Sequence, residues 1–209
     1  MEIKSQQELT FRALGALENY AWQIDTTSPK HFTITAEISG DSTIAEWSSA
    51  LKKVQSMHPL VNARVDTGGD GRLHFVHDQN INFPLSVGRL SKVTSIEDEI
   101  RREFSAPFGE GDVALLKAAL LYSEHCCVII ITAHHAIADG RSLTYFIHDL
   151  LETLSGKELP ELALLPPIEE LCSPGAGPVG DIAMPAFTAS PVPYAERSLP
   201  RLKIHRQRL

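Results

Sequence analysis

Hydrophobic and polar positions follow several different periods along the first 158 residues. Residues His31–Ile38 alternate between the two and are rich in β-branched side chains, which predicts a strand. A helix is expected next, capped by Asp41 or Ser42 and ended by Pro59. Its apolar positions recur at the spacing of one buried helix face: Ile44, Trp47, Leu51 and Val54.

The next patterns predict a hairpin, a helix and two further strands. Extended residues Leu60–Val65 and Arg72–His77 flank a glycine-rich turn, as in a β-hairpin. Ser95–Phe104 predicts a short helix with acidic residues first and basic residues after them. Val113–Tyr122 and His125–Ala133 predict strands, and the second is apolar on both faces, as expected of a central strand covered on both sides.

The last predicted helix starts at Ser142, whose side chain could cap it. Its apolar residues form one amphipathic face: Leu143, Phe146, Ile147, Leu150, Leu151 and Leu154. Nine of the thirteen prolines lie in residues 160–209. Because proline fixes φ and removes a backbone donor, this part is expected to be a linker or arm. The patterns therefore predict a mixed α/β domain over residues 1–158 and a proline-rich arm over residues 159–209.

Composition excludes several classes of protein. The chain has 209 residues, 43% hydrophobic and 22% charged, with a formal net charge of −7, as in ordinary globular domains. Its longest largely apolar run, Cys126–Ala133, is far shorter than the ~20 residues of a membrane span, and the N-terminus lacks the apolar core of a signal peptide. Three cysteines, two of them adjacent in that run, favour reduced thiols and a cytoplasmic location. The acidic charge disfavours nucleic-acid binding.

The segment Ile131–Ser142 carries the candidate chemistry. It runs from a buried strand through His134 and His135 to Asp139 and Gly140, before the last helix. Strand side chains alternate, so the two histidines face opposite ways and one faces any cleft at the strand end. A neutral imidazole there can accept a proton, and an aspartate can fold back to hold the loop. A structural role for the histidine pair remains an alternative, and no third ligand has the spacing of a metal site.

The string His134-His135-Ala136-Ile137-Ala138-Asp139-Gly140 resembles the HHxxxDG motif of the condensation-domain and chloramphenicol-acetyltransferase superfamily. Met57–Arg64 is similar to a second segment of that superfamily, and Leu115–Leu120 to the strand before the motif. Leu165–Leu171 resembles the proline-rich exit after the motif helix. In order and spacing the segments look most like the N-terminal half of a polyketide-associated, phthiocerol dimycocerosyl transferase-like protein.

The resemblance implies a chloramphenicol-acetyltransferase-like two-layer sandwich with a mixed β-sheet. It implies acyl transfer from a thioester, on coenzyme A or a carrier-protein phosphopantetheine, to a hydroxyl or amine acceptor in polyketide, nonribosomal peptide or lipid biosynthesis. The thioester is then a co-substrate, and no bound cofactor is expected. His135 is implied as the general base beside His134, Asp139 as a structural residue and Gly140 as the turn. No acyl-enzyme is implied, so Cys126 and the adjacent Cys127 are read as core residues.

Two features depart from this pattern. The arginine that pairs with the motif aspartate in the superfamily falls at Asn62 here. The expected partner of Asp139 is therefore Arg64, two residues further on, or Asn62 itself. The similar proteins are about twice as long, and Leu202–His205 alternates like the first strand of a second half. A second-half chain is therefore an expected partner. A single-half trimeric acetyltransferase and a non-catalytic binding module remain alternatives.

Other histidines and basic residues are expected to have structural or solvent-exposed roles. His58, before Pro59, is expected to pack at a helix end, and His148 to be exposed or to contact another domain. A group of basic residues near the C-terminus is expected to be the polar face of the terminal strand or a solvated tail: Arg197, Arg201, Lys203, Arg206 and Arg208.

Overall fold

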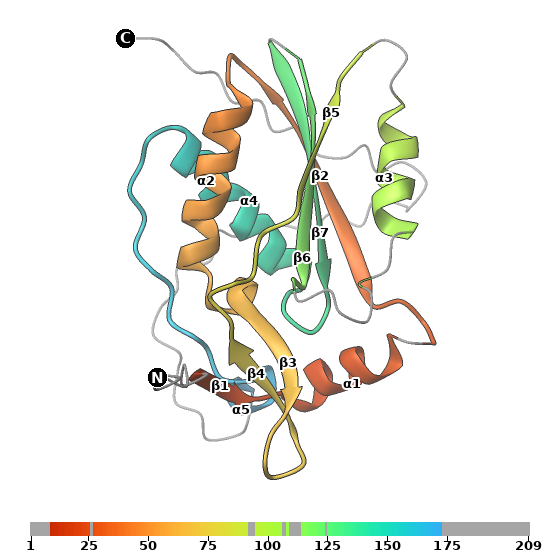
Figure 1. The fold of residues 1–209 in the computed structure, drawn as a ribbon, viewed down its shortest axis with the longest axis vertical. Coiled ribbons are helices and arrows are strands. Elements are labelled where there is room, and N and C mark those ends of the chain that lie inside the picture. Colours follow the sequence, from red (N-terminus) through yellow and green to blue (C-terminus); the bar gives the residue numbers. More distant parts are fainter. Residues whose placement is uncertain are drawn as a thin grey trace, which may run out of the picture.

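A computed structural model describes residues 9–25, 27–91, 95–105, 108, 114–123 and 125–172 (Figure 1). The strands are β1 (Leu9–Ala13), β2 (His31–Ser39), β3 (Ala63–Thr67), β4 (Leu73–His77), β5 (Leu85–Arg89), β6 (Leu116–Tyr122) and β7 (Cys126–His134). The helices are α1 (Ala16–Ile24), α2 (Ile44–Met57), the 3₁₀ helix η1 (Pro59–Asn62), α3 (Ile96–Ser105), α4 (Gly140–Leu154) and α5 (Ile168–Leu171).

The main sheet has four strands in the order β2-β7-β6-β5. It is mixed, because β5 runs parallel to β6 whereas β2, β7 and β6 pair antiparallel. In the β2–β7 register His31, the first residue of β2, lies opposite His134, the last residue of β7 before the motif loop. The mixed α/β class expected from the sequence is confirmed.

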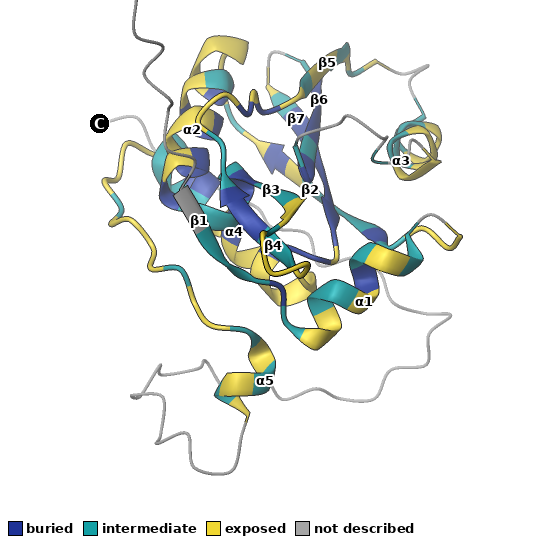
Figure 2. Ribbon diagram, turned by 60° about the horizontal axis from the view of Figure 1, so that its bottom comes forward, coloured by how far each residue is buried: buried dark blue, intermediate teal, exposed yellow. Residues whose placement is uncertain are grey.

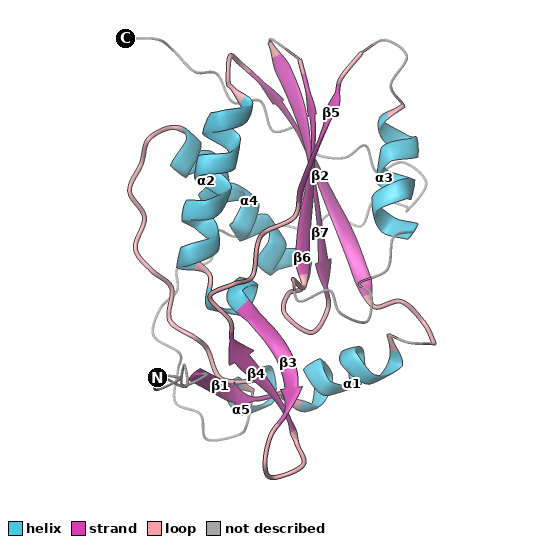
Figure 3. Cartoon of the chain, viewed as in Figure 1, coloured by secondary structure: helices cyan, strands magenta, loops and turns pink. Residues whose placement is uncertain are grey.

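Helices cover both faces of this sheet (Figure 3). Alternate residues of β7, such as Ile129 and Ile131, join the large core with α2 and α4. The residues between them, such as Val128 and Ile130, pack with α3 through Ile96 and Ile100. Every residue of β7 after Cys126 is buried, as Figure 2 shows. The prediction that this apolar strand is central and covered on both sides is therefore confirmed.

Helix α2 follows its predicted pattern except at the start. Trp47, Leu51 and Val54 are buried, whereas Ile44 in the first turn is 41% exposed. The cap is Thr43 rather than Asp41 or Ser42. Its hydroxyl accepts from the backbone N–H of Glu46, whose carboxylate accepts from the Thr43 N–H in return. This reciprocal pair satisfies two backbone donors of the first turn, which explains the position of the helix start.

A second, smaller sheet has the order β1-β4-β3, and β3 and β4 form the predicted hairpin. The expected extended segment Leu60–Val65 is wrong in its first part, because residues Pro59–Asn62 form the 3₁₀ helix η1. Proline suits the first position of η1. A backbone N–H at this position would have no partner within the helix, so the absence of an N–H in proline costs no hydrogen bond. The hydrophobic patterns did not predict β1, α1, β5 or α5, and α5 lies in the segment expected to be a linker or arm.

Beyond α4 the chain is extended and then ends its described part in α5. In Figure 1 this segment passes along α2 and reaches α5 beside β1. The remainder of the proline-rich arm, with the Leu202–His205 strand and the C-terminal basic group, lies outside the described residues. None of the described helices has the length and hydrophobicity that crossing a membrane requires.

Candidate active site

The motif loop joins β7 to α4 and is held by backbone hydrogen bonds at its start. The N–H of His135 donates to the carbonyl of Lys30 (2.7 Å), which lies just before β2. The N–H of Ile137 donates to the carbonyl of His134 (3.1 Å), which closes a turn. These two hydrogen bonds therefore hold the start of the motif loop against the sheet, and the motif side chains project from this loop.

His135 is exposed and lies flat against Phe32, with ring centroids 4.3 Å apart and an interplanar angle of 24°. Its Nδ1 lies 3.2 Å from the carbonyl oxygen of Ala138. A carbonyl oxygen can only accept, so Nδ1 is the protonated nitrogen of the neutral ring. Nε2 then carries the free lone pair and is the atom that can take a proton.

His134 faces the other way and is buried, with 1% of its surface exposed. Its Nδ1 accepts from the N–H of Ala136 (3.0 Å), so Nε2 carries the proton of its neutral form. Nε2 lies 3.4 Å from an oxygen of Asp25 but lacks hydrogen-bond geometry. Burial lowers the pKa of His134, and the Asp25 carboxylate opposes this only in part. The structure thus places His134 as a neutral ring that supports the loop.

Asp139 is the N-cap of α4. Its Oδ1 accepts from both the backbone N–H and the hydroxyl of Ser142, each at 2.7 Å. Burial acts to raise the pKa of Asp139, but these hydrogen bonds outweigh it and the pKa lies below its usual value. The cap is thus Asp139 rather than Ser142. Gly140 begins the helix without a positive φ, and a Cβ added there would meet no atom within 4 Å, so the structure shows no turn that needs glycine at this position.

The expected partners of Asp139 are wrong. Arg64 forms an ion pair with Asp66 (2.5 Å) and lies 3.9 Å from Asp78. The side chain of Asn62 exchanges hydrogen bonds with Gln55 at the end of α2. Arg64 and Asn62 belong to β3 and η1, whereas Asp139 makes its hydrogen bonds within the first turn of its own helix.

A cavity of about 580 Å³ lies beside the motif loop. His135, Asp139 and Ser142 line it together with Phe146 of α4. The remaining walls come from β1, α1, η1, β6 and the chain after α4, and most of their side chains are apolar, with Arg12 and Glu18 as the charged members. Its size and mainly apolar lining with a few polar groups are typical of a small-molecule site.

His58 lines the same cavity and forms the junction between α2 and η1. Its Nε2 lies 3.0 Å from an oxygen of Asp149, and its ring packs edge-on against Phe146. Burial lowers the pKa of His58, and this outweighs the opposing effect of Asp149. His58 therefore packs at the helix end as predicted. His148 is exposed on α4, next to Asp149.

None of the three cysteines is among the residues that line this cavity. Cys127 is buried, and its burial raises the pKa of its thiol to about 11. Cys126 is partly buried and contacts Ser123, and Cys172 is exposed. Within the described residues, no group of three or more His, Cys, Asp or Glu side chains is placed to hold a metal ion.

Comparison with known proteins identifies relatives of the chain. The family model for the condensation domain matches residues 20–166. The chain is similar to bacitracin synthase 3 of Bacillus licheniformis, with 25% identity over 169 residues that cover 78% of this chain and 3% of that protein. It is also 26% identical over 131 residues to gramicidin S synthase 2 of Brevibacillus brevis, covering 61% of this chain and 3% of that protein. The chain spans only a small part of these relatives.

Solved structures share the fold. The first condensation domain of the calcium-dependent antibiotic synthetase, in complex with a substrate analogue, superposes with a TM-score of 0.60 at 21% identity, covering 74% of this chain and 41% of that one. Polyketide synthase associated protein 5 from Mycobacterium tuberculosis gives a TM-score of 0.55 at 18% identity, covering 76% and 37%. The fold class and the superfamily resemblance predicted from the sequence are confirmed. The chain belongs to the condensation-domain family.

Proposed function

We propose that this chain is the N-terminal, base-carrying part of a condensation-type acyltransferase. Its donor is an acyl thioester on the phosphopantetheine of a carrier protein, and its acceptor is an amine or a hydroxyl. His135 is the general base, and His134, Asp139 and Ser142 hold the loop that presents it. A second half, on the same or another chain, completes the walls of the site.

The geometry of His135 is the observation that carries this proposal. Its Nδ1 proton is engaged by the Ala138 carbonyl, which leaves Nε2 as the basic atom. Phe32 stacks on the ring and restricts its rotation. The same side chain lines a cavity of about 580 Å³, so an acceptor bound there can reach a base that is already in the required tautomer.

The proposed step needs no covalent enzyme intermediate. Nε2 of His135 takes the proton of the acceptor as its nitrogen or oxygen attacks the thioester carbonyl. The carbonyl π electrons move to oxygen, and the tetrahedral intermediate collapses with cleavage of the C–S bond. The proton held on Nε2 goes to the departing sulfur. The products are an amide or ester and the free thiol of the donor, and His135 returns to its neutral form.

Family membership supports a carrier protein as the source of the thioester. Condensation domains form amide or ester bonds between substrates bound to carrier proteins, within multidomain synthetases. The chain also matches synthases such as bacitracin synthase 3 and gramicidin S synthase 2. Coenzyme A carries the same phosphopantetheine arm, and it is therefore the comparison donor in the test below.

An acyl-transfer assay with the full 209-residue chain tests the proposal. The chain is mixed with an amine acceptor and with the same acyl group on either a carrier protein or coenzyme A, and product is followed by mass spectrometry. We expect amide formation, faster from the carrier protein, and its loss in His135→Ala. Hydrolysis without amide, or amide formation at an unchanged rate in His135→Ala, would contradict the proposal. Equal rates from both donors would contradict the carrier-protein assignment.

A further inference from the structure

Residues 159–171, here called the strap, follow α4, and several of them line the same cavity as His135. We propose that the strap is a specificity-determining wall that contacts the apolar part of the acyl group, and that Arg12 is the residue that fixes this wall in place. The inference rests on the proposed function, because it assigns the acyl group to the cavity beside the proposed base.

Side chains of the strap form one side of the cavity. The residues concerned are Ala163, Leu164, Leu165, Pro166, Ile168 and Leu171. The motif loop and α4 also line the cavity, with His135 and Phe146, and so do Arg12 and Glu18. A second cavity of about 590 Å³ is also lined by residues 164–166 of the strap, together with β1. The strap at these residues is therefore a thin wall between two spaces, and its position decides the width of the space at His135.

The wall is apolar and accessible to a ligand. Leu165 is 63% exposed and Ile168 is 51% exposed, although both line the cavity. Leucine and isoleucine side chains gain free energy when a bound group removes them from water. An apolar acyl chain entering beside His135 would cover them. This favours an aliphatic or other apolar acyl group over a charged one.

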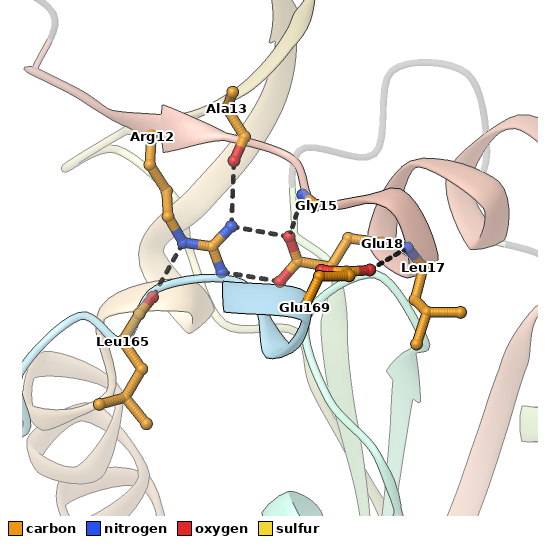
Figure 4. Close-up of polar contacts among 7 residues, drawn as sticks. All are labelled: Arg12, Ala13, Gly15, Leu17, Glu18, Leu165 and Glu169. Carbon is orange, nitrogen blue, oxygen red and sulfur yellow. Dashed lines mark hydrogen bonds and ion pairs between the residues drawn. The ribbon is translucent and has the colours of Figure 1, made fainter. Parts of the chain in front are cut away.

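Arg12 of β1 holds the middle of the strap (Figure 4). Its Nε donates to the carbonyl oxygen of Leu165 at 2.9 Å. Its two terminal nitrogens donate to the two carboxylate oxygens of Glu18, each at 2.7 Å, and one also donates to the Ala13 carbonyl at 3.1 Å. This paired geometry fixes the plane of the guanidinium, and so the position of the strap carbonyl that it binds.

Other contacts fix the strap on either side of Leu165. The N–H of Leu162 donates to the carbonyl of Met57 at the end of α2 (3.0 Å). The carboxylate of Glu169 accepts from the N–H of Leu17 at the start of α1 (2.7 Å). The strap is thus attached to α2, β1 and α1, whereas its side chains at residues 163–166 face the cavity.

Gly15 provides an independent sign that the strap packs closely against the junction between β1 and α1. A Cβ added at Gly15 would lie 2.5 Å from the Cβ of Pro167 and 2.5 Å from a carboxylate oxygen of Glu169. Both atoms belong to the strap, so a side chain at this position would push it outward. Gly15 also donates its N–H to the Glu18 carboxylate that pairs with Arg12 (2.7 Å). The close contact and the Arg12 hydrogen bonds therefore hold the strap at the same place.

Binding of unreactive acyl analogues tests the proposal without catalysis. The probes are acyl-aminopantetheines, in which NH replaces the thioester sulfur, with acetyl, butanoyl, hexanoyl and octanoyl groups. Calorimetry on the full chain should show affinity rising about fourfold for each buried CH₂. Leu165→Asp should weaken octanoyl binding at least tenfold and leave acetyl binding within twofold. Leu162→Asp is the matched control, because Leu162 lies on the same strap, is 45% exposed and lines neither of these two cavities.

Arg12→Gln and Gly15→Ala test the fixing of the wall. Each should reduce the preference for octanoyl over acetyl at least threefold, with the chain still folded by circular dichroism. A general loss of stability would weaken all probes alike and would contradict the positioning role. Octanoyl binding by Leu165→Asp within twofold of the unsubstituted chain would overturn the proposal. The probes are unreactive, so their binding tests the wall without acyl transfer, whereas the transfer rate of His135→Ala tests the base. A failure of the wall and a failure of the proposed base therefore appear in different measurements.

Discussion

Nδ1 of His135 lies 3.2 Å from the carbonyl oxygen of Ala138, three residues further along the same loop. This short-range contact assigns the tautomer of the proposed base. A carbonyl oxygen can only accept a hydrogen bond, so the ring nitrogen that faces it must carry the proton. His134, the preceding residue, has the opposite arrangement, since its Nδ1 accepts from the Ala136 N–H. Two adjacent histidines are thereby given different tautomers and different surroundings.

Nitrogen-15 NMR of the imidazoles tests this assignment directly. Above pH ~7.5, where the neutral form of an ordinary histidine dominates, His135 should be the Nδ1–H tautomer and His134 the Nε2–H tautomer. The Ala138 carbonyl and the Ala136 N–H are the physical reasons. Single His→Gln variants assign the signals. A His135 ring that is mainly protonated on Nε2 would contradict the proposed geometry.

Asp139→Ala should lower the free energy of unfolding by about 1 kcal/mol, the usual cost of losing an N-cap. The Ser142 N–H and hydroxyl would lose their shared acceptor. Asp139→Asn is the control, because asparagine caps nearly as well as aspartate. Urea unfolding with circular dichroism measures the difference. Equal losses in the two variants would argue against the capping role.

The same cap predicts a dependence on acid. The folded pKa of Asp139 is lowered, because its hydrogen bonds from Ser142 outweigh the effect of burial. Its contribution to stability is therefore complete above the unfolded pKa of about 3.9 and is lost as the pH falls through the lower folded value. The unsubstituted chain should lose more stability than Asp139→Asn over this acidic range. Identical acid profiles for the two proteins would contradict the predicted linkage.

His58 predicts a second pH dependence, nearer to neutrality. Burial lowers its pKa in the folded state, and the facing Asp149 only partly opposes this. The unfolded state then binds more protons, so stability should fall as the pH drops below about 6.5. His58→Gln should flatten this decrease. The buried His134 acts in the same direction, so part of the decrease should remain in His58→Gln. Unchanged pH profiles in His58→Gln would refute this account.

The cysteines should react at very different rates. Cys172 is exposed, whereas burial raises the pKa of the Cys127 thiol to about 11. At pH ~8 the thiolate fraction of Cys127 is then roughly one part in a thousand, and the thiol is also covered. Iodoacetamide followed by mass spectrometry should modify Cys172 first and leave Cys127 intact in the folded chain. Early labelling of Cys127 would show that it is not a core residue.

The sequence predicted the parts of the fold that depend on local patterns. The strand at β7 and the helix face of Leu143, Phe146 and Leu150 were recognisable because their hydrophobic periods are long and regular. The N-cap residues were harder to predict. Thr43 and Asp139 have neighbours whose side chains are also of a type that caps helices. Strands β1 and β5 are five residues each, and they lack the glycine-rich turn that marks the equally short β3 and β4 as a hairpin.

The candidate site was only partly predictable for a different reason. The motif places His134, His135 and Asp139 within six residues, so the loop could be located from the sequence. The environment of each residue depends on segments far away in the chain: Phe32 stacks on His135, and Asp25 lies beside His134. The Asp139–Arg64 contact failed because Arg64 pairs with acidic residues near its own strand. Asp66 lies two residues away on β3, whereas Asp78 follows β4 and is brought close only by the pairing of β3 with β4.

The most direct test of the central claim is the single-turnover rate of acyl transfer by His135→Ala. Removing a general base should lower the rate by about 10²–10⁴-fold. His148→Ala, an exposed histidine on α4 that lies outside the described cavity, is the matched control and should stay within threefold of the unsubstituted chain. Circular dichroism confirms that both variants are folded. A rate in His135→Ala within threefold of the unsubstituted chain would contradict the role of His135 as the base.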